Sequence, residues 1–247
     1  YKIFNGNLLY HGCIPTKEDG SFDDVYIDGQ YLSGKRYLKQ VEDKVRKAFY
    51  CEVGSEEQLN ALDYCWYLWC GPKSPLFGKN KMTTFERYFI EDKETHKESY
   101  NSYYYHIDKK DYCESILKEF DLDIHKSHIV NGHVPVKTHK GESPIKGGGI
   151  LLVIDGGLSK AYHKSTGIGG YTLISNSNAM IIAEHRPFAE VVESGFRISP
   201  KTTIVDRFVT RITVGETDIG IGLNKRISDL EELLNAYRNG IVKEKVN

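Results

Sequence analysis

The sequence lacks both a long apolar segment and a pattern of paired cysteines. No apolar run approaches the roughly 20 residues that a helix needs to cross a bilayer. The 5 cysteines are an odd number and include no Cys-x-x-Cys pair, so neither a disulfide framework nor a zinc ribbon is indicated. We therefore predict no membrane partner. We expect the cysteines to be small buried side chains in the reducing cytoplasm.

An excess of one charge is also missing, since the formal net charge is −1. Without a basic field the chain as a whole is not expected to bind nucleic acid. A small anionic substrate would need only a local cluster of Lys and Arg, which net charge does not exclude. Hydrophobic residues make up 40% of the chain, with 17 Tyr and 10 Phe. This content predicts a packed core and argues against disorder.

Two histidines beside glycine are the most informative feature that is present. His11 follows an expected strand at Asn7–Leu9, and His133 follows another at residues 128–130. Neutral imidazole is the commonest metal ligand, and an adjacent glycine lets the chain turn sharply at a strand end. Each histidine taken alone also fits a purely structural role. Together they suggest half of a metal centre, and we predict that His11 and His133 lie close together at strand ends.

Apolar periodicity predicts helices in the first half of the chain. One is expected over residues 35–49 and another over residues 109–120, with the polar and aromatic stretch 73–105 mostly loop. Ser55 and Gln58 form a capping-box pattern before a further helix that should end at Gly71. That helix has one apolar face, which we expect to lie in the core, made of Leu59, Leu62, Trp66 and Trp69.

The second half has a different character. Residues 150–154 read as a buried strand, and the polar segment 175–178 reads as a hairpin turn between strands at 170–174 and 179–183. Residues 202–213 are β-rich. A second capping-box pattern at Ser228 and Glu231 predicts a helix that ends near Gly240.

These elements indicate an α/β protein. We expect a helical and loop insertion over about residues 30–127 and a β-rich half with the metal site over 128–215. A C-terminal helix is expected over 226–240. The first residue is Tyr1 and a strand-end histidine arrives by residue 11, so we expect this chain to be a piece of a longer polypeptide.

Several separated motifs occur in a familiar order. Between about residues 8 and 188 the chain resembles the class III fructose-1,6-bisphosphatases, a bacterial family of calcineurin-like metallophosphoesterases. The motifs that carry the resemblance are Leu9-Tyr10-His11-Gly12-Cys13-Ile14-Pro15, the stretches 66–79 and 82–89, 131–136, Lys140-Gly141-Glu142-Ser143-Pro144, Leu152-Val153-Ile154-Asp155-Gly156-Gly157 and 166–174.

The resemblance implies a fold and a ligand set. The fold would be part of a β-sandwich flanked by helices, with the helical insertion before the Gly-His loop. In the wider family, Asp-x-His, Gly-Asp-x-x-Asp and Gly-Asn-His come before a lone His and a Gly-His pair. On that pattern the metal ligands here are His11 and His133. The earlier motifs do not precede His11. The catalytic residues are therefore expected in a missing N-terminal half, which would be this chain's partner.

The implied activity is two-metal hydrolysis of fructose 1,6-bisphosphate to fructose 6-phosphate and phosphate in gluconeogenesis, with Mn²⁺ as the cofactor. Basic side chains should meet the phosphates, and the candidates are Lys79, Arg87, Lys160 and Lys164. Each of them also fits a solvated surface charge. Two alternatives stay open: another calcineurin-like phosphatase, acting on phosphoproteins or dinucleoside polyphosphates, and a non-catalytic binding or oligomerisation module. A homo-oligomer is compatible with all of these.

Overall fold

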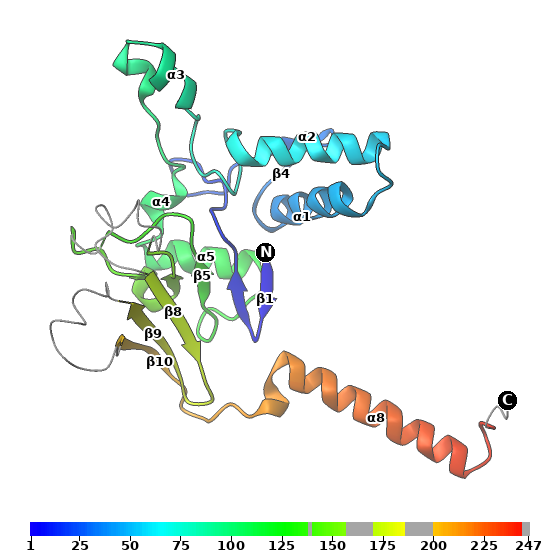
Figure 1. Ribbon diagram of the computed structural model, residues 1–247. Coiled ribbons are helices and arrows are strands. Elements are labelled where there is room, and N and C mark those ends of the chain that lie inside the picture. The colour runs from blue at the N-terminus through cyan, green and yellow to red at the C-terminus, as the bar shows by residue number, and fades with distance from the viewer. Residues whose placement is uncertain (138–139, 157–169, 186–199, 244–247) are drawn as a thin grey trace, which may run out of the picture. The chain divides into compact units, whose positions relative to one another are not determined.

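The computed structural model describes residues 1–137, 140–156, 170–185 and 200–243 (Figure 1). Its contacts divide the chain into two units. The first comprises residues 1–173 and 183–202, and the second comprises residues 174–182 and 203–247. None of the helices in this described part is long and apolar enough to cross a membrane.

A five-stranded sheet forms the centre of the first unit. Its strand order is β1 (Lys2–Phe4), β2 (Asn7–Leu9), β5 (Ile129–Asn131), β7 (Leu151–Val153) and β6 (Ile145–Lys146). The three central strands β2, β5 and β7 run parallel, and the two edge strands pair antiparallel. The strands predicted at Asn7–Leu9 and 150–154 are confirmed, and the one predicted at 128–130 lies one residue further on.

The central strands are mostly apolar, as expected of parallel strands covered on both faces. Leu8, Ile129 and Leu151 are fully buried. Helix α5 (Lys110–Glu119) belongs to the same core, because Ile116 and Leu117 on its apolar stripe are also fully buried. The helix predicted over 109–120 is therefore confirmed, and the α/β class with it.

Two long helices follow the small β3 (Val25–Ile27) and β4 (Gln30–Leu32) hairpin. Helix α1 spans Gly34–Tyr50, which confirms the prediction for 35–49, and helix α2 spans Glu56–Cys70. The Ser55 side chain accepts a hydrogen bond from the Gln58 backbone at 3.2 Å. This is the predicted cap, although the Gln58 side chain accepts from Gly54 instead of closing the box on Ser55.

The prediction that the apolar face of α2 lies in the core is wrong. Ala61 and Leu68 are the buried residues of α2, and α1 and α2 lie side by side (Figure 1). The opposite stripe faces outward, with Trp66 67% exposed and Trp69 57% exposed. The two indole rings lie 4.9 Å apart and contact each other. Helical spacing identifies a common face correctly, but it does not say what that face meets.

The stretch predicted as mostly loop, residues 73–105, contains three short helices. They are α3 (Thr84–Phe89), η1 (Lys93–His96) and α4 (Tyr103–His106). The short 3-10 turn η3 (Gly147–Gly149) follows β6 further along the chain. All five cysteines are unpaired, and burial is confirmed for Cys13 and Cys113. Cys51, Cys65 and Cys70 are half-buried.

A three-stranded sheet has the order β10 (Lys201–Arg207), β9 (Ala179–His185), β8 (Gly170–Ser175). The predicted hairpin is confirmed: within the turn, the Asn176 side chain accepts hydrogen bonds from the backbone of Asn178 and Ala179, each at 2.9 Å. Of the β-rich segment 202–213, the strand ends at Arg207 and the remainder is irregular before the short turn η4 (Val214–Glu216).

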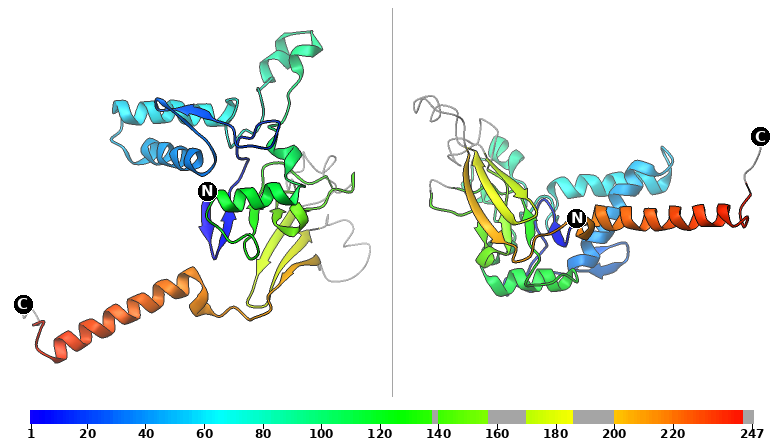
Figure 2. Two further views of the ribbon diagram at one scale, coloured as in Figure 1. Left: turned by 180° about the vertical axis from the view of Figure 1, so that it is seen from behind. Right: turned by 90° about the horizontal axis from the view of Figure 1, so that it is seen from below.

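The C-terminal helix α8 spans Asp218–Arg238 and is one uninterrupted helix (Figure 2). The predicted start at residue 226 is therefore wrong. Thr217 is the N-cap, and its side chain accepts from the Gly220 backbone at 3.1 Å. Gly220 and Gly222 have low helix propensity and hid this first turn from sequence reasoning. The predicted end is confirmed, because Gly240 has φ +68° just after the last helical residues.

Candidate metal centre

The two histidines predicted as ligands lie close together. His11 follows β2 and His133 follows β5, and these strands are parallel neighbours. Their carboxyl ends therefore meet at one edge of the sheet, where ligand sites of open α/β sheets form. The ring centroids lie 5.2 Å apart, edge to face, with an interplanar angle of 76°. The predicted approach of the two rings is confirmed.

His133 is held with one ring nitrogen directed to the protein. Its Nε2 atom lies 3.1 Å from the Phe77 carbonyl oxygen. A carbonyl oxygen only accepts, so Nε2 carries the proton and Nδ1 keeps its lone pair. Burial lowers the pKa of His133, and the nearby His11 lowers it further. The hydrogen bond to Phe77 raises the pKa, but its effect is smaller than that of burial. The lowered pKa favours the neutral imidazole, and this hydrogen bond favours the tautomer protonated on Nε2, which is a form that can bind a metal through Nδ1.

The backbone of His133 is unusual. Its φ of +71° lies in the left-handed region, which costs a non-glycine residue of order 1 kcal/mol. The surrounding hydrogen bonds maintain this conformation: Gly132 N donates to the His11 carbonyl at 3.0 Å, and Val134 N donates to the Gly132 carbonyl at 2.9 Å. The turn directs the ring of His133 back toward His11.

Asp155 is a third side chain at the same edge, and sequence reasoning did not name it as a site residue. It follows β7, the next parallel strand after β5. A pocket of about 320 Å³ is lined by His11, Gly132, Ile154, Asp155, Gly156 and Gly170. The negative charge of Asp155 favours the protonated form of His133. Its position directly after the apolar run 150–154 was the available sequence signal, the same one that identified the histidines.

Gly132 lies between these groups. A Cβ atom at this position would lie 3.4 Å from His11 Nδ1 and 3.8 Å from Asp155 Cβ. Glycine thus leaves the space between the imidazole and the carboxylate open.

Asn131 connects the loop that carries His133 to the loop that carries His11. It is 2% exposed, and its Nδ2 atom lies 2.5 Å from the Gly12 carbonyl oxygen and 3.3 Å from the His11 carbonyl oxygen. All its near partners are carbonyl oxygens, so the amide nitrogen must face them. The residue before the Gly-His pair therefore sets the path of the loop that carries His11.

The segment 75–77 supports both histidines from the other side. Cys13 N donates to the Pro75 carbonyl at 2.8 Å, and the Phe77 carbonyl accepts from His133. Gly12 passes so close to Pro75 that an added Cβ would lie 2.0 Å from its carbonyl oxygen.

Within the ranges that the structure describes, no group of three or more His, Cys, Asp or Glu side chains is placed to hold a metal ion. The described residues thus bring two imidazoles together, with a carboxylate nearby, and this is fewer donors than a two-metal centre needs.

The family model described as firmicute fructose-1,6-bisphosphatase matches residues 1–239. The chain belongs to this family. Two relatives, from Clostridium botulinum (strain Kyoto / Type A2) and Clostridium novyi (strain NT), are named fructose-1,6-bisphosphatase class 3. Each is 50% identical over 247 residues, which cover 99% of this chain and 37% of the relative. No solved structure matches the chain.

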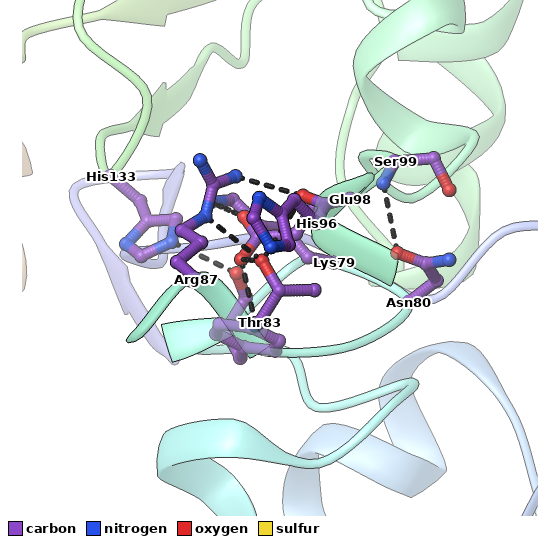
Figure 3. A network of polar contacts seen from close by, with 9 residues as sticks. Lys79, Asn80, Thr83, Arg87, His96, Glu98, Ser99 and His133 are labelled. Atoms are coloured by element: carbon purple, nitrogen blue, oxygen red, sulfur yellow. Dashed lines mark hydrogen bonds and ion pairs between the residues drawn. The ribbon is translucent and has the colours of Figure 1, made fainter. Parts of the chain in front are cut away.

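Two of the basic residues predicted to meet phosphate, Lys79 and Arg87, have protein partners in this structure. Lys79 Nζ lies 2.7 Å from Glu98 Oε2, in an ion pair of low exposure. Arg87 Nε donates to Thr83 Oγ1 at 3.1 Å, and its terminal nitrogen donates to the His96 carbonyl at 2.9 Å. Figure 3 shows this network beside His133. Phosphate binding by Lys79 or Arg87 stays a prediction, and Lys160 and Lys164 lie outside the described residues.

A larger cavity of about 600 Å³ is also lined in part by His11. It is lined mainly by apolar side chains of α1, including Leu38, Val41 and Val45, and by Leu76. Its charged members Glu42 and Arg46 pair with each other at 2.8 Å. An apolar lining of this kind does not match a sugar bisphosphate, so the small pocket at the strand ends is the better candidate site.

Proposed function

We propose that this chain contributes to an Mn²⁺-dependent fructose-1,6-bisphosphatase of the calcineurin-like metallophosphoesterase type. The observation that carries the proposal is the pair His11 and His133 at the ends of parallel neighbouring strands, in a chain whose relatives are named fructose-1,6-bisphosphatase class 3. The chain spans only 37% of the length of those relatives. The activity therefore belongs to a polypeptide of their full length.

The donor set fits a divalent cation. His133 offers Nδ1 because Nε2 is engaged with Phe77, and His11 has its ring beside it at the same edge. Imidazole and carboxylate donors are compatible with Mn²⁺. Bound metal would lower the pKa of a coordinated water and stabilise the attacking and leaving oxygens. We expect further donors, including a bridging carboxylate, from residues outside these 247.

The residues of this chain would hold the metal ion and orient its ligands. His11 and His133 would act as ligands, and Asn131 and residues 75–77 would fix their separation. Asp155 would lie beside the ligands and add negative charge that favours a cation. Cytoplasmic placement agrees with the five unpaired cysteines, and gluconeogenic hydrolysis of fructose 1,6-bisphosphate agrees with the names of the relatives.

A chimera tests the proposal. These 247 residues would replace the matching residues of the Clostridium botulinum relative, which is possible because half of the aligned residues are identical. We expect Mn²⁺-dependent release of phosphate from fructose 1,6-bisphosphate by the chimera, and none by the 247-residue chain alone, because two imidazoles do not hold two cations. A folded chimera with no phosphatase activity at any Mn²⁺ concentration would refute the proposal. Strong activity of the isolated chain would show that outside donors are not needed.

A further inference from the structure

Helix α8 presents an exposed row of large apolar side chains. Within Asp218–Arg238 the only buried residue is Gly220. The exposed fractions of the row lie between 41% for Tyr237 and 63% for Leu230. Surface helices of globular proteins normally bury their apolar stripe against a core. We define the members of this row as the α8 seam: Leu223, Ile227, Leu230, Leu234 and Tyr237.

The spacing of the α8 seam is that of a coiled coil. Successive members are separated by four, three, four and three residues, a mean period of 3.5. A repeat of 3.5 keeps one narrow seam facing a second helix over the whole length, whereas a period of 3.6 suits packing on a globular core. In heptad terms Ile227 and Leu234 occupy a positions, and Leu223, Leu230 and Tyr237 occupy d positions. Ile227 at a with Leu230 at d is the combination that favours two strands in a parallel coiled coil.

Charges beside the seam complement one another between two copies. Arg226 occupies the g position before Ile227, and Glu231 occupies the e position after Leu230. In a parallel pair, a g residue faces the e residue of the next heptad on the other helix, five positions further on. Arg226 of one copy would therefore meet Glu231 of the other, and two-fold symmetry would form this pair twice. Along one helix, residues five apart are not neighbours.

The residues on the other side of the α8 seam are also compatible with a parallel pair. Leu233 at g would face Arg238 at e of the second copy, where the aliphatic stem of the arginine can cover the leucine while its head group stays in water.

We propose that α8 pairs in parallel with α8 of a second copy of this chain as a two-stranded coiled coil. The seam covers only residues 223–237, so we expect a weak association that depends on protein concentration. The proposal does not depend on the metal centre or on the phosphatase activity.

Sedimentation equilibrium of the full 247-residue chain tests the pairing. We expect a monomer–dimer equilibrium in the unaltered chain. Ile227→Lys and Leu230→Lys should each weaken association at least tenfold, because each places an ammonium group in the seam. The matched control is Ile221→Lys. Ile221 is 58% exposed on the same helix but lies off the seam, so its replacement should leave association unchanged.

Charge reversal tests the partner and its direction. Arg226→Glu and Glu231→Arg should each weaken association, and the double variant should restore it, since the pair is then re-formed with opposite signs between copies. These side chains are exposed, so helicity by circular dichroism should not change. A chain that is monomeric at all soluble concentrations would overturn the proposal. So would equal effects of Ile221→Lys and Ile227→Lys, or a double reversal that fails to restore association.

Discussion

The Nδ2 atom of Asn131 lies 2.5 Å from the carbonyl oxygen of Gly12. This contact joins the end of β5 to the loop that follows β2, so the loops that carry His11 and His133 cannot move independently. Gly132 N, which donates to the His11 carbonyl at 3.0 Å, reinforces the same connection. The separation of the two imidazoles therefore depends on the residues that lie between them.

Replacing Asn131 by Asp should damage this connection. A carboxylate cannot donate, and it would face carbonyl oxygens in a position that is 2% exposed. Leaving those groups unsatisfied should lower the free energy of unfolding by about 1–3 kcal/mol, measured by urea denaturation. Mn²⁺ affinity of the chimera should also fall, by about 10–100-fold, as for other residues that orient ligands.

Asn101→Asp is the matched control for that substitution. The Asn101 side chain accepts from Thr16 N at 3.1 Å and from Tyr103 N at 3.0 Å, and a carboxylate can accept both. Its effect on unfolding should be small. Equal effects of the two substitutions would show that the donor of Asn131 has no special role.

His11→Ala and His133→Ala should each abolish most Mn²⁺-dependent hydrolysis by the chimera. Loss of a ligand should exceed the roughly 10–100-fold loss that follows changes in residues behind the ligands. The assay is phosphate release at limiting Mn²⁺, with far-UV circular dichroism as the check on folding. His125→Ala is the control, because His125 is exposed and precedes β5, whereas the candidate ligands follow the carboxyl ends of β2 and β5. Unaltered turnover in either strand-end variant would contradict the ligand role.

Gly12→Ala should be destabilising although the φ of Gly12 is not in the left-handed region. The new Cβ would lie 2.0 Å from the Pro75 carbonyl oxygen, so the segment that supports both histidines must move. We expect a loss of about 1–3 kcal/mol, the usual range for overpacking. Gly222→Ala, with nothing within 4 Å of the new Cβ, should instead stabilise α8 by up to about 1 kcal/mol. Urea titration followed by circular dichroism compares the two.

Low pH should destabilise the region around α3, because Glu98 becomes protonated there. Burial raises the pKa of Glu98, but hydrogen bonds from Lys79 and from Thr83 outweigh it and lower the pKa from 4.5 to about 2. The folded form therefore binds this proton less readily than the unfolded chain. The stabilising contribution is complete above pH 4.5 and is lost as the pH falls toward 2.

Glu98→Gln removes the titrating group and should reduce the loss of unfolding free energy between pH 6 and about pH 3. Glu94→Gln is the control, since Glu94 pairs with Lys97 at the surface, where the Glu94 side chain is 73% exposed. Identical pH dependence in the Glu98→Gln variant and the unaltered chain would show that Glu98 does not carry the effect.

Local sequence patterns were sufficient to predict most of the helices and several of the strands. Helices α1, α2 and α5, the strands β2 and β7, and the hairpin of β8 and β9 follow from apolar periodicity and turn residues, because both signals act over a few neighbouring residues. The start of α8 was not predictable in this way. Two glycines weaken its first turns, and the Thr217 cap that stabilises them is evident only from the hydrogen bond to Gly220.

Tertiary structure decided whether the apolar face of a helix is buried or exposed. Leu59, Leu62, Trp66 and Trp69 share one side of α2, as their spacing requires, but that side is exposed. Periodicity specifies which side chains point together and not which surface they meet. The same distinction applies to Lys79 and Arg87, whose head groups are engaged with Glu98, Thr83 and His96.

For the candidate site, the sequence by itself was sufficient to select His11 and His133 as candidate ligands, because a histidine beside a glycine just after a strand can be recognised locally. Only the tertiary structure decided that these rings lie 5.2 Å apart, that the Phe77 carbonyl fixes which nitrogen of His133 stays free, and that Asn131 and Asp155 belong to the same edge. Such relationships join residues that are distant in the sequence, for example Asn131 and His11, which are 120 positions apart. They arise from the order in which β2, β5 and β7 assemble, and no local pattern encodes that order.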